Sequence, residues 1–128
     1  MIVTDVLKRE VWEKGQKVEG FDPGMYRKDA CGAWIIWDKY GALDNLYGWQ
    51  IDHICPVSRL EKRGFSEAEI WNIRNLRPLQ CLNNISKDDD YPSYTAAITS
   101  DGGKNIQKEV NLTVNAIVRE QLRDLYQL

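Results

Sequence analysis

The residues of this chain best suited to chemistry lie in two polar segments, about thirty positions apart. The first segment carries an acidic residue followed directly by the only histidine, Asp52-His53. The second carries two amides and a lysine, Asn75, Asn84 and Lys87. Histidine is the one side chain whose unperturbed pKa lies near neutrality, so His53 is the natural candidate for a base. Together these residue types suit metal-assisted cleavage of a phosphodiester bond.

The needs of that reaction explain why these residue types matter. Phosphodiester cleavage requires an activated nucleophile and stabilisation of the charge on the phosphate and the leaving oxygen. A neutral imidazole can supply the first and one divalent ion the second. Asp52 and Asn84 are hard oxygen ligands that leave room for water and phosphate, which suits Mg²⁺ and also Mn²⁺. Each residue also has a purely structural interpretation, as a cap, a turn residue or a buried imidazole.

The composition predicts one globular domain. The chain has 128 residues, of which 43% are hydrophobic and 28% charged, and this is enough for one domain with a real core. The longest apolar run, residues 33–37, is far too short to cross a membrane. The N-terminus lacks the pattern of a signal peptide. We therefore expect a cytoplasmic protein with no membrane contact.

The charge distribution is uneven. The net charge of −2 does not fit a strongly basic DNA-binding protein, but residues 52–87 carry six cations against four anions. Such a segment predicts a local cationic surface that holds a phosphate backbone with salt-sensitive affinity. Ordinary solvated charge is the alternative interpretation for any single arginine.

The cysteines favour reduced structural thiols. Cys31, Cys55 and Cys81 are odd in number and far apart, and no Cys-x-x-Cys pair occurs. The sequence therefore predicts neither a disulfide framework nor a four-cysteine zinc site.

The segment around the histidine predicts a strand that ends at the candidate base. Residues 49–55 alternate weakly between apolar and polar types, after an earlier aromatic and β-branched strand at 31–38. Asp52 and His53 are neighbours, so in a strand they point to opposite faces. Both can serve one site only if the chain bends there, and Pro56 follows closely, as a bend requires.

Other local signals predict helices around this strand and a hairpin near the C-terminus. Ser66-Glu67-Ala68-Glu69 is a capping box that opens a short helix to about Ile73. The other expected elements are a helix over 5–13 capped by Thr4, an extended edge segment over 75–80 with Pro78, a helical stretch over 81–87, a hairpin of 94–99 with 106–114 turning at Asp101-Gly102-Gly103, and a helix over 115–126.

Three motifs in this order carry a family resemblance: Asp52-His53, then Asn75-Leu76-Arg77-Pro78-Leu79, then Asn84-Ile85-Ser86-Lys87, with Tyr40-Gly41 and Gly48-Trp49 as a lead-in. The set resembles the H-N-H endonuclease motif of the ββα-metal (His-Me finger) nucleases, as found in small phage and bacterial members. The resemblance covers roughly half the chain. It implies an α+β fold in a single domain, 1–128. A ββα-metal core spans about 49–90, after an N-terminal helix, and a C-terminal hairpin and helix extend it over about 91–128.

The resemblance also implies a role for each motif position. His53 matches the general base that activates water, and Asn75 matches the residue whose amide braces the loop that carries the histidine. Asp52 and Asn84 match two ligands of a catalytic Mg²⁺ or Mn²⁺. Two cations are expected to contact the phosphate backbone: Lys87 and Arg77.

One departure from the family concerns zinc. Relatives with a structural zinc carry two Cys-x-x-Cys pairs, whereas Gln80 and Asn83 stand where the second pair would be. The resemblance therefore implies no structural zinc in this chain.

We expect a metal-dependent endonuclease that hydrolyses phosphodiester bonds in DNA, by nicking or by cutting the duplex, with RNA open as a second substrate. One alternative is a nucleic-acid-binding module that keeps the fold without cutting, and metal-dependent nicking of a plasmid would decide between the two. Another is a nuclease toxin with an immunity partner. Growth arrest on expression, relieved by His53→Ala, would favour the toxin.

Overall fold

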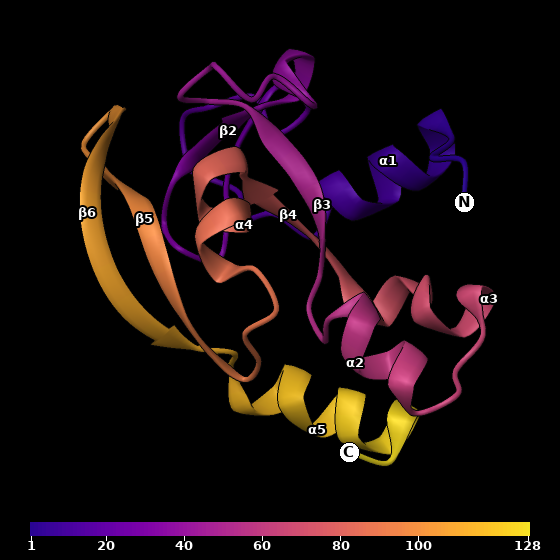
Figure 1. Cartoon of the computed structure of the whole chain (residues 1–128). Coiled ribbons are helices and arrows are strands. Elements are labelled where there is room, and N and C mark those ends of the chain that lie inside the picture. The colour runs from indigo at the N-terminus through magenta and orange to yellow at the C-terminus, as the bar shows by residue number, and fades with distance from the viewer.

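Three antiparallel strand pairs, linked and covered by short helices, make up the structure (Figure 1). The computed structural model describes all 128 residues. The α+β class predicted from the sequence is confirmed. In chain order the elements are α1 (Asp5–Trp12), β1 (Tyr26–Lys28), β2 (Trp34–Ile36), the 3₁₀ turn η1 (Trp37–Lys39), β3 (Trp49–His53), α2 (Val57–Lys62), α3 (Glu67–Ile70), the 3₁₀ turn η2 (Ile73–Asn75), β4 (Leu76–Gln80), α4 (Cys81–Lys87), β5 (Ser93–Asp101), β6 (Lys104–Thr113) and α5 (Ala116–Tyr126).

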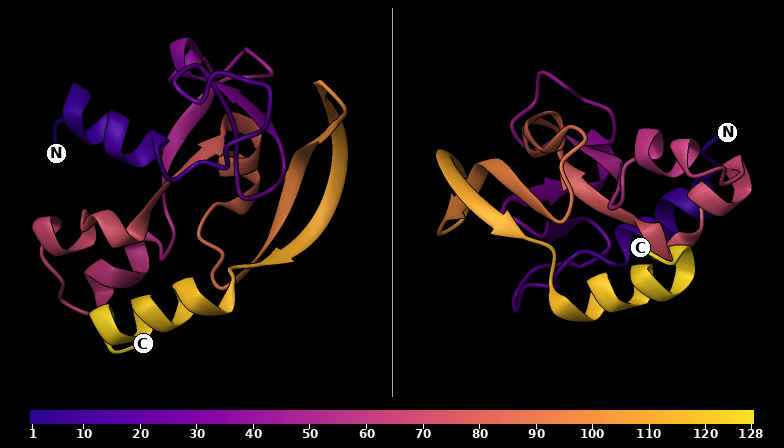
Figure 2. Two further views of the ribbon diagram at one scale, coloured as in Figure 1. Left: turned by 180° about the vertical axis from the view of Figure 1, so that it is seen from behind. Right: turned by 60° about the horizontal axis from the view of Figure 1, so that its bottom comes forward.

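The strand pair β3–β4 and the helix α4 form the centre of the molecule. β3 pairs antiparallel with β4, and Asp52 lies opposite Arg77. α4 begins at the residue after β4, and the side chain of Gln80 caps it by accepting the N–H of Asn83 at 3.0 Å. α4 packs against both strands, while α1 and the β5–β6 hairpin lie on opposite sides of this unit (Figure 2).

The capping signals in the sequence predicted the helix starts well. Thr4 caps α1 as predicted, by accepting a backbone N–H of the first turn. Asn115, expected as the first residue of the last helix, is instead the cap of α5. Ser66 and Glu69 make both hydrogen bonds of the predicted capping box. The helix that they open ends at Ile70, earlier than expected, because a separate 3₁₀ turn, η2, follows it.

Two elements, β1 and α2, were not predicted, and a third is shorter than expected. β1 has only three residues and pairs with β2, so it is too short to show an alternating pattern. α2 has six residues and begins directly after Pro56, which also leaves too little sequence for a helical period. The strand expected over 31–38 is limited to β2, because η1 follows it at once.

Two hydrophobic clusters hold these elements together. The larger one joins α2, α3 and α5 to the C-terminal hairpin, and Tyr126 of α5 also donates its hydroxyl to the carbonyl of Glu69 at 2.6 Å. Five buried side chains form the smaller cluster, which packs α1 on β2, β3 and β4: Val11, Trp12, Ile35, Trp49 and Leu76. None of the helices is both long enough and apolar enough to span a membrane.

A glycine just before β3 allows a close backbone approach. A Cβ atom at Gly48 would lie 2.0 Å from the carbonyl oxygen of Ala42, and backbone cannot yield as a flexible side chain can. We expect Gly48→Ala to lower the free energy of unfolding by about 2–3 kcal/mol through overpacking. Gly103→Ala is the matched control, because nothing lies within 4 Å of a Cβ atom there. Equal denaturation midpoints for the two variants would contradict this prediction.

Candidate functional site

A buried carboxylate, Asp52, lies at the centre of the β3–β4–α4 unit. Asp52 is only 4% exposed. Its Oδ2 accepts a hydrogen bond from Nε of Arg77 at 2.8 Å, and its Oδ1 lies 3.3 Å from Nζ of Lys87. A buried charge is costly unless it is paired and hydrogen-bonded. The three charged side chains therefore form one unit, called here the Asp52 triad, which joins β3, β4 and α4.

The two cations that were expected to contact phosphate belong to this triad. Lys87 has no exposed surface and also donates to the backbone carbonyl of His53 at 3.1 Å. Arg77 is 9% exposed, and its guanidinium lies 5.1 Å from the ring centre of Tyr94. Burial lowers the pKa of Lys87, and the nearby Asp52 opposes that shift. The expected position of Lys87 and Arg77 on an open cationic surface is therefore wrong, because the buried Asp52 takes both as partners.

The imidazole of His53 lies on the other face of β3. Its ring packs edge-on against Trp71, with 4.4 Å between ring centres, whereas Asp52 faces α4. β3 continues through His53, and the bend in the chain begins only at Ile54. Because strand residues alternate between faces, the predicted bend comes too late to turn both side chains to one side.

His53 keeps a neutral ring in this environment. Burial lowers its pKa from the usual value near 6.5, although the Asp52 charge opposes that shift. Its Nε2 atom is buried and has no hydrogen-bond partner. A neutral imidazole retains a nitrogen lone pair that can accept a proton at pH 7.

Asn75 fixes the turn that follows His53. Its Oδ1 accepts the N–H of Cys55 at 2.8 Å, and its Nδ2 donates to the carbonyls of Cys55 at 3.1 Å and Ile70 at 3.3 Å. Its own backbone carbonyl accepts the N–H of Ile54 at 2.8 Å. Asn75 is fully buried. These contacts match the bracing position that the resemblance implied for this residue.

Asn84 is near the Asp52 triad without joining it. It lies on α4, and its Nδ2 donates to Oε1 of Gln50 at 3.0 Å. Gln50 precedes Asp52 by two residues on β3, so the two side chains share one face of the strand. The structure therefore places Asn84 and Asp52 on adjoining positions, but no hydrogen bond links them.

The expected divalent ion can be tested against these side chains. Carboxylate and amide oxygens suit Mg²⁺ in kind. In this arrangement, however, both oxygens of Asp52 are bonded to cations, and Arg77 and Lys87 together outweigh its charge. A divalent ion would be repelled by both cations. No group of three or more His, Cys, Asp and Glu side chains gathers elsewhere. As arranged, these residues do not fit the ion.

A second buried acid, Asp29, was missed by sequence reasoning. Its Oδ1 accepts the backbone N–H groups of Cys31 and Ala33, and its Oδ2 accepts the backbone N–H of Gln80 and Nδ2 of Asn83. The Oδ1 of Asn83 in turn accepts two N–H groups of β5, each at 2.8 Å. The bond to Cys31 is an Asx-type turn, a signal present in the sequence. This network ties α4 to the N-terminal loop and to the C-terminal hairpin.

Comparison with known proteins finds no match for this chain among family models, curated proteins or solved structures. The resemblance to H-N-H endonucleases therefore rests on the motif residues themselves.

The brace formed by Asn75 generates a stability prediction. Asn75→Ala would leave buried backbone groups of Cys55 and Ile70 without partners, at about 1–3 kcal/mol for each group. We expect a loss of about 3 kcal/mol or more in denaturant unfolding, and faster hydrogen exchange at the Cys55 amide. Gln107→Ala, at an exposed position on β6, is the control and should change the stability by less than about 0.5 kcal/mol. Protection of the Cys55 amide as in the wild type would refute the brace.

The Asp52 triad generates a second stability prediction. Lys87→Met keeps an unbranched side chain, one atom shorter, but removes the ammonium that pairs with a buried carboxylate. We expect a loss of about 3 kcal/mol, at the low end for a broken buried ion pair because Arg77 still holds Asp52. Lys62→Met, at an exposed position on α2, is the matched control. If both variants unfold at the same denaturant concentration, Lys87 contributes no more than a surface lysine.

Proposed function

We propose that this chain is an endonuclease of the H-N-H type, with a ββα-metal (His-Me finger) core, that hydrolyses phosphodiester bonds in DNA. One observation carries the proposal: β3 and β4 pair antiparallel across the two short helices between them, α4 follows β4 directly, and Asn75 braces the turn directly after His53. This combination supports the proposed roles of His53 and Asn75, whereas the proposed metal ligands draw no support from it. RNA is the second substrate to be tested.

His53 is assigned as the general base. Its lowered pKa favours the neutral ring, and only the neutral ring can take a proton from water. Its Nε2 is buried beside Trp71, so this role requires the imidazole or the loop to move when a substrate binds. Catalytic geometry commonly becomes complete only in the substrate complex.

The metal part of the proposal rests on the resemblance alone. Mg²⁺, with Mn²⁺ as a substitute, is the ion that the motif implies, but Asp52 is held by Arg77 and Lys87. We therefore assign the ion no step in the reaction. Nicking of a supercoiled plasmid with Mg²⁺ and with EDTA measures the requirement directly.

The Asp52 triad favours one rival function. A carboxylate that is fully neutralised by two cations is typical of a structural role, and the same fold would then bind nucleic acid without cutting it. Absence of nicking under every metal condition, together with measurable DNA binding, would establish this alternative.

The assignment of His53 predicts the effect of its removal. His53→Ala should lower plasmid nicking by about 10²–10⁴-fold, the usual contribution of a general base, while the fold is kept. Asp89→Ala, an exposed acid after α4, is prepared in the same way and should cleave like the wild type. Activity of His53→Ala within a few-fold of that control would exclude His53 as the base and would point to a contaminating nuclease.

The pKa of His53 predicts the pH profile of cleavage. Because the neutral ring is the active form and burial lowers its pKa below 6.5, activity should rise with pH at a point below 6.5 and stay flat above it. Initial rates measured from pH 4.5 to 9 provide the test. A rise centred above pH 7 would assign the base to another group.

A further inference from the structure

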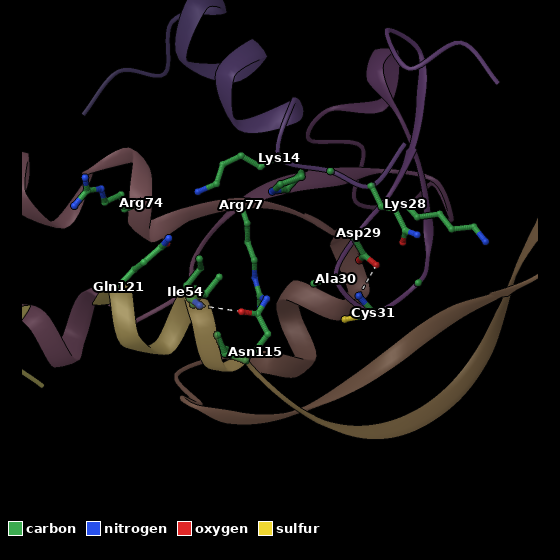
Figure 3. Close-up of a pocket in the computed structure, with 16 residues that line it drawn as sticks. Lys14, Lys28, Asp29, Ala30, Cys31, Ile54, Arg74, Arg77, Asn115 and Gln121 are labelled. Carbon is green, nitrogen blue, oxygen red and sulfur yellow. Dashed lines mark hydrogen bonds between the residues drawn. The ribbon is translucent and has the colours of Figure 1, made fainter. Parts of the chain in front are cut away.

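A cationic cavity lies between the N-terminal loop, β4 and the start of α5 (Figure 3). Its volume is about 540 Å³, within the range of sites for small organic ligands. One acid lines it, Asp29, against four cations: Lys14, Lys28, Arg74 and Arg77.

Two of these five charges do not act inside the cavity. Both oxygens of Asp29 are occupied by N–H donors, so its carboxylate is not free to pair with a cation there. Lys28 lies 4.9 Å from the ring centre of Trp34, and Figure 3 shows it extending away from Arg77. The remaining cations are Lys14 and Arg77 in the cavity and Arg74 at its rim, where Figure 3 shows the exposed Arg74 side chain extending away from Arg77.

Arg77 provides the strongest observation. Its Nε is paired with Asp52, but its Nη2 is buried and has no hydrogen-bond partner, although the residue is only 9% exposed. An unsatisfied buried donor on a charged group is costly, so this position favours an anionic acceptor, which reaches Nη2 once the side chains that cover it shift. In Figure 3 the side chain reaches from β4 toward Asn115 at the start of α5.

Lys14 adds a second donor on the same wall. Its Nζ donates to the carbonyl of Ile73 at 2.7 Å and to the carbonyl of Leu76, which leaves one N–H free. Loss of hydration at this ammonium, with repulsion from Arg77, lowers the pKa of Lys14 to about 8. Two cations are thus held near each other with no free acid between them, and a bound anion would relieve that repulsion.

The other walls suit the rest of a ligand. α5 has 11 residues, and its start lines the cavity, so the positive end of the helix dipole adds to the attraction for an anion. Apolar side chains cover part of the surface: Ile54, Pro78, Val114 and Val118. The cavity therefore offers an end that binds an anion and an end that binds an apolar group.

We propose that this cavity binds a phosphomonoester on a nucleotide-sized ligand, with Arg77 and Lys14 as the phosphate donors. A phosphomonoester carries a charge near −2 at neutral pH, which suits a cavity where Lys14 has no acidic partner and Nη2 of Arg77 lacks an acceptor. The ligand is a free nucleotide or the 5′-terminal nucleotide of a strand, since both present this group. The inference holds whether or not the chain cleaves nucleic acid.

Titration calorimetry on the full-length chain at low salt tests the proposal with adenosine 5′-monophosphate, adenosine and a 5′-phosphorylated single-stranded oligonucleotide. The monophosphate should bind at least about tenfold more tightly than adenosine, with inorganic phosphate as a competitor. Lys14→Met should weaken monophosphate binding by about tenfold, because it removes one charge-assisted contact. Arg74→Gln should weaken binding by a smaller factor, because Arg74 adds charge at the rim without a contact. Lys104→Met, an exposed lysine on β6, is the control and should bind like the wild type.

The oligonucleotide arm distinguishes the two sources of the phosphate. Tighter binding of the oligonucleotide than of the monophosphate assigns the site to a strand end, and the reverse assigns it to a free nucleotide. The proposal is overturned if the monophosphate does not bind, if adenosine binds equally well, or if neither Lys14→Met nor Arg74→Gln weakens binding. Arg77 is left unchanged because it also holds Asp52.

Discussion

Asp52 cannot be buried alone, and much of the centre of this protein follows from that constraint. The carboxylate lies on β3, one of its cations on β4 and the other on α4, so satisfying its charge fixes the position of all three elements. Lys87 also bonds the carbonyl of His53, which links the same helix to the end of the strand. Ion pairs on a protein surface often add little to stability. Here the buried ion pairs of Asp52 set the relative positions of β3, β4 and α4.

The segments outside the motif close one face of this unit. Asn83 and Ser86 of α4 bond the backbone of β5, and Tyr94 of β5 covers Arg77. The face that carries Asp52 is therefore buried, whereas the half-buried His53 lies on the opposite face beside Trp71. Of these two neighbours, the histidine is therefore the more exposed.

Sequence reasoning succeeded where the signal is local. Caps such as Thr4 and Ser66 involve residues three positions apart, and the alternating pattern of the C-terminal hairpin extends over many residues. The bracing position of Asn75 came from the ordered motif. Sequence reasoning failed for Lys87, because a lysine on a short helix looks like a surface cation until its partner, 35 positions earlier, is known. Asp29 was missed for the same reason, since two of its four donors lie more than 50 residues away.

The contacts of Lys14 tie the N-terminal segment to the loop that carries the histidine. Its ammonium holds the carbonyls of Ile73 and Leu76, which flank Asn75 on both sides, and it comes from the loop directly after α1. Trp12 of α1 is buried in the cluster that contains Trp49 of β3. The first third of the chain is thus part of the support for the histidine loop. A fragment trimmed to the motif, residues 49–90, would lose this support and expose an apolar face of the β3–β4 strand pair. The smallest unit that keeps these contacts is therefore much larger than residues 49–90.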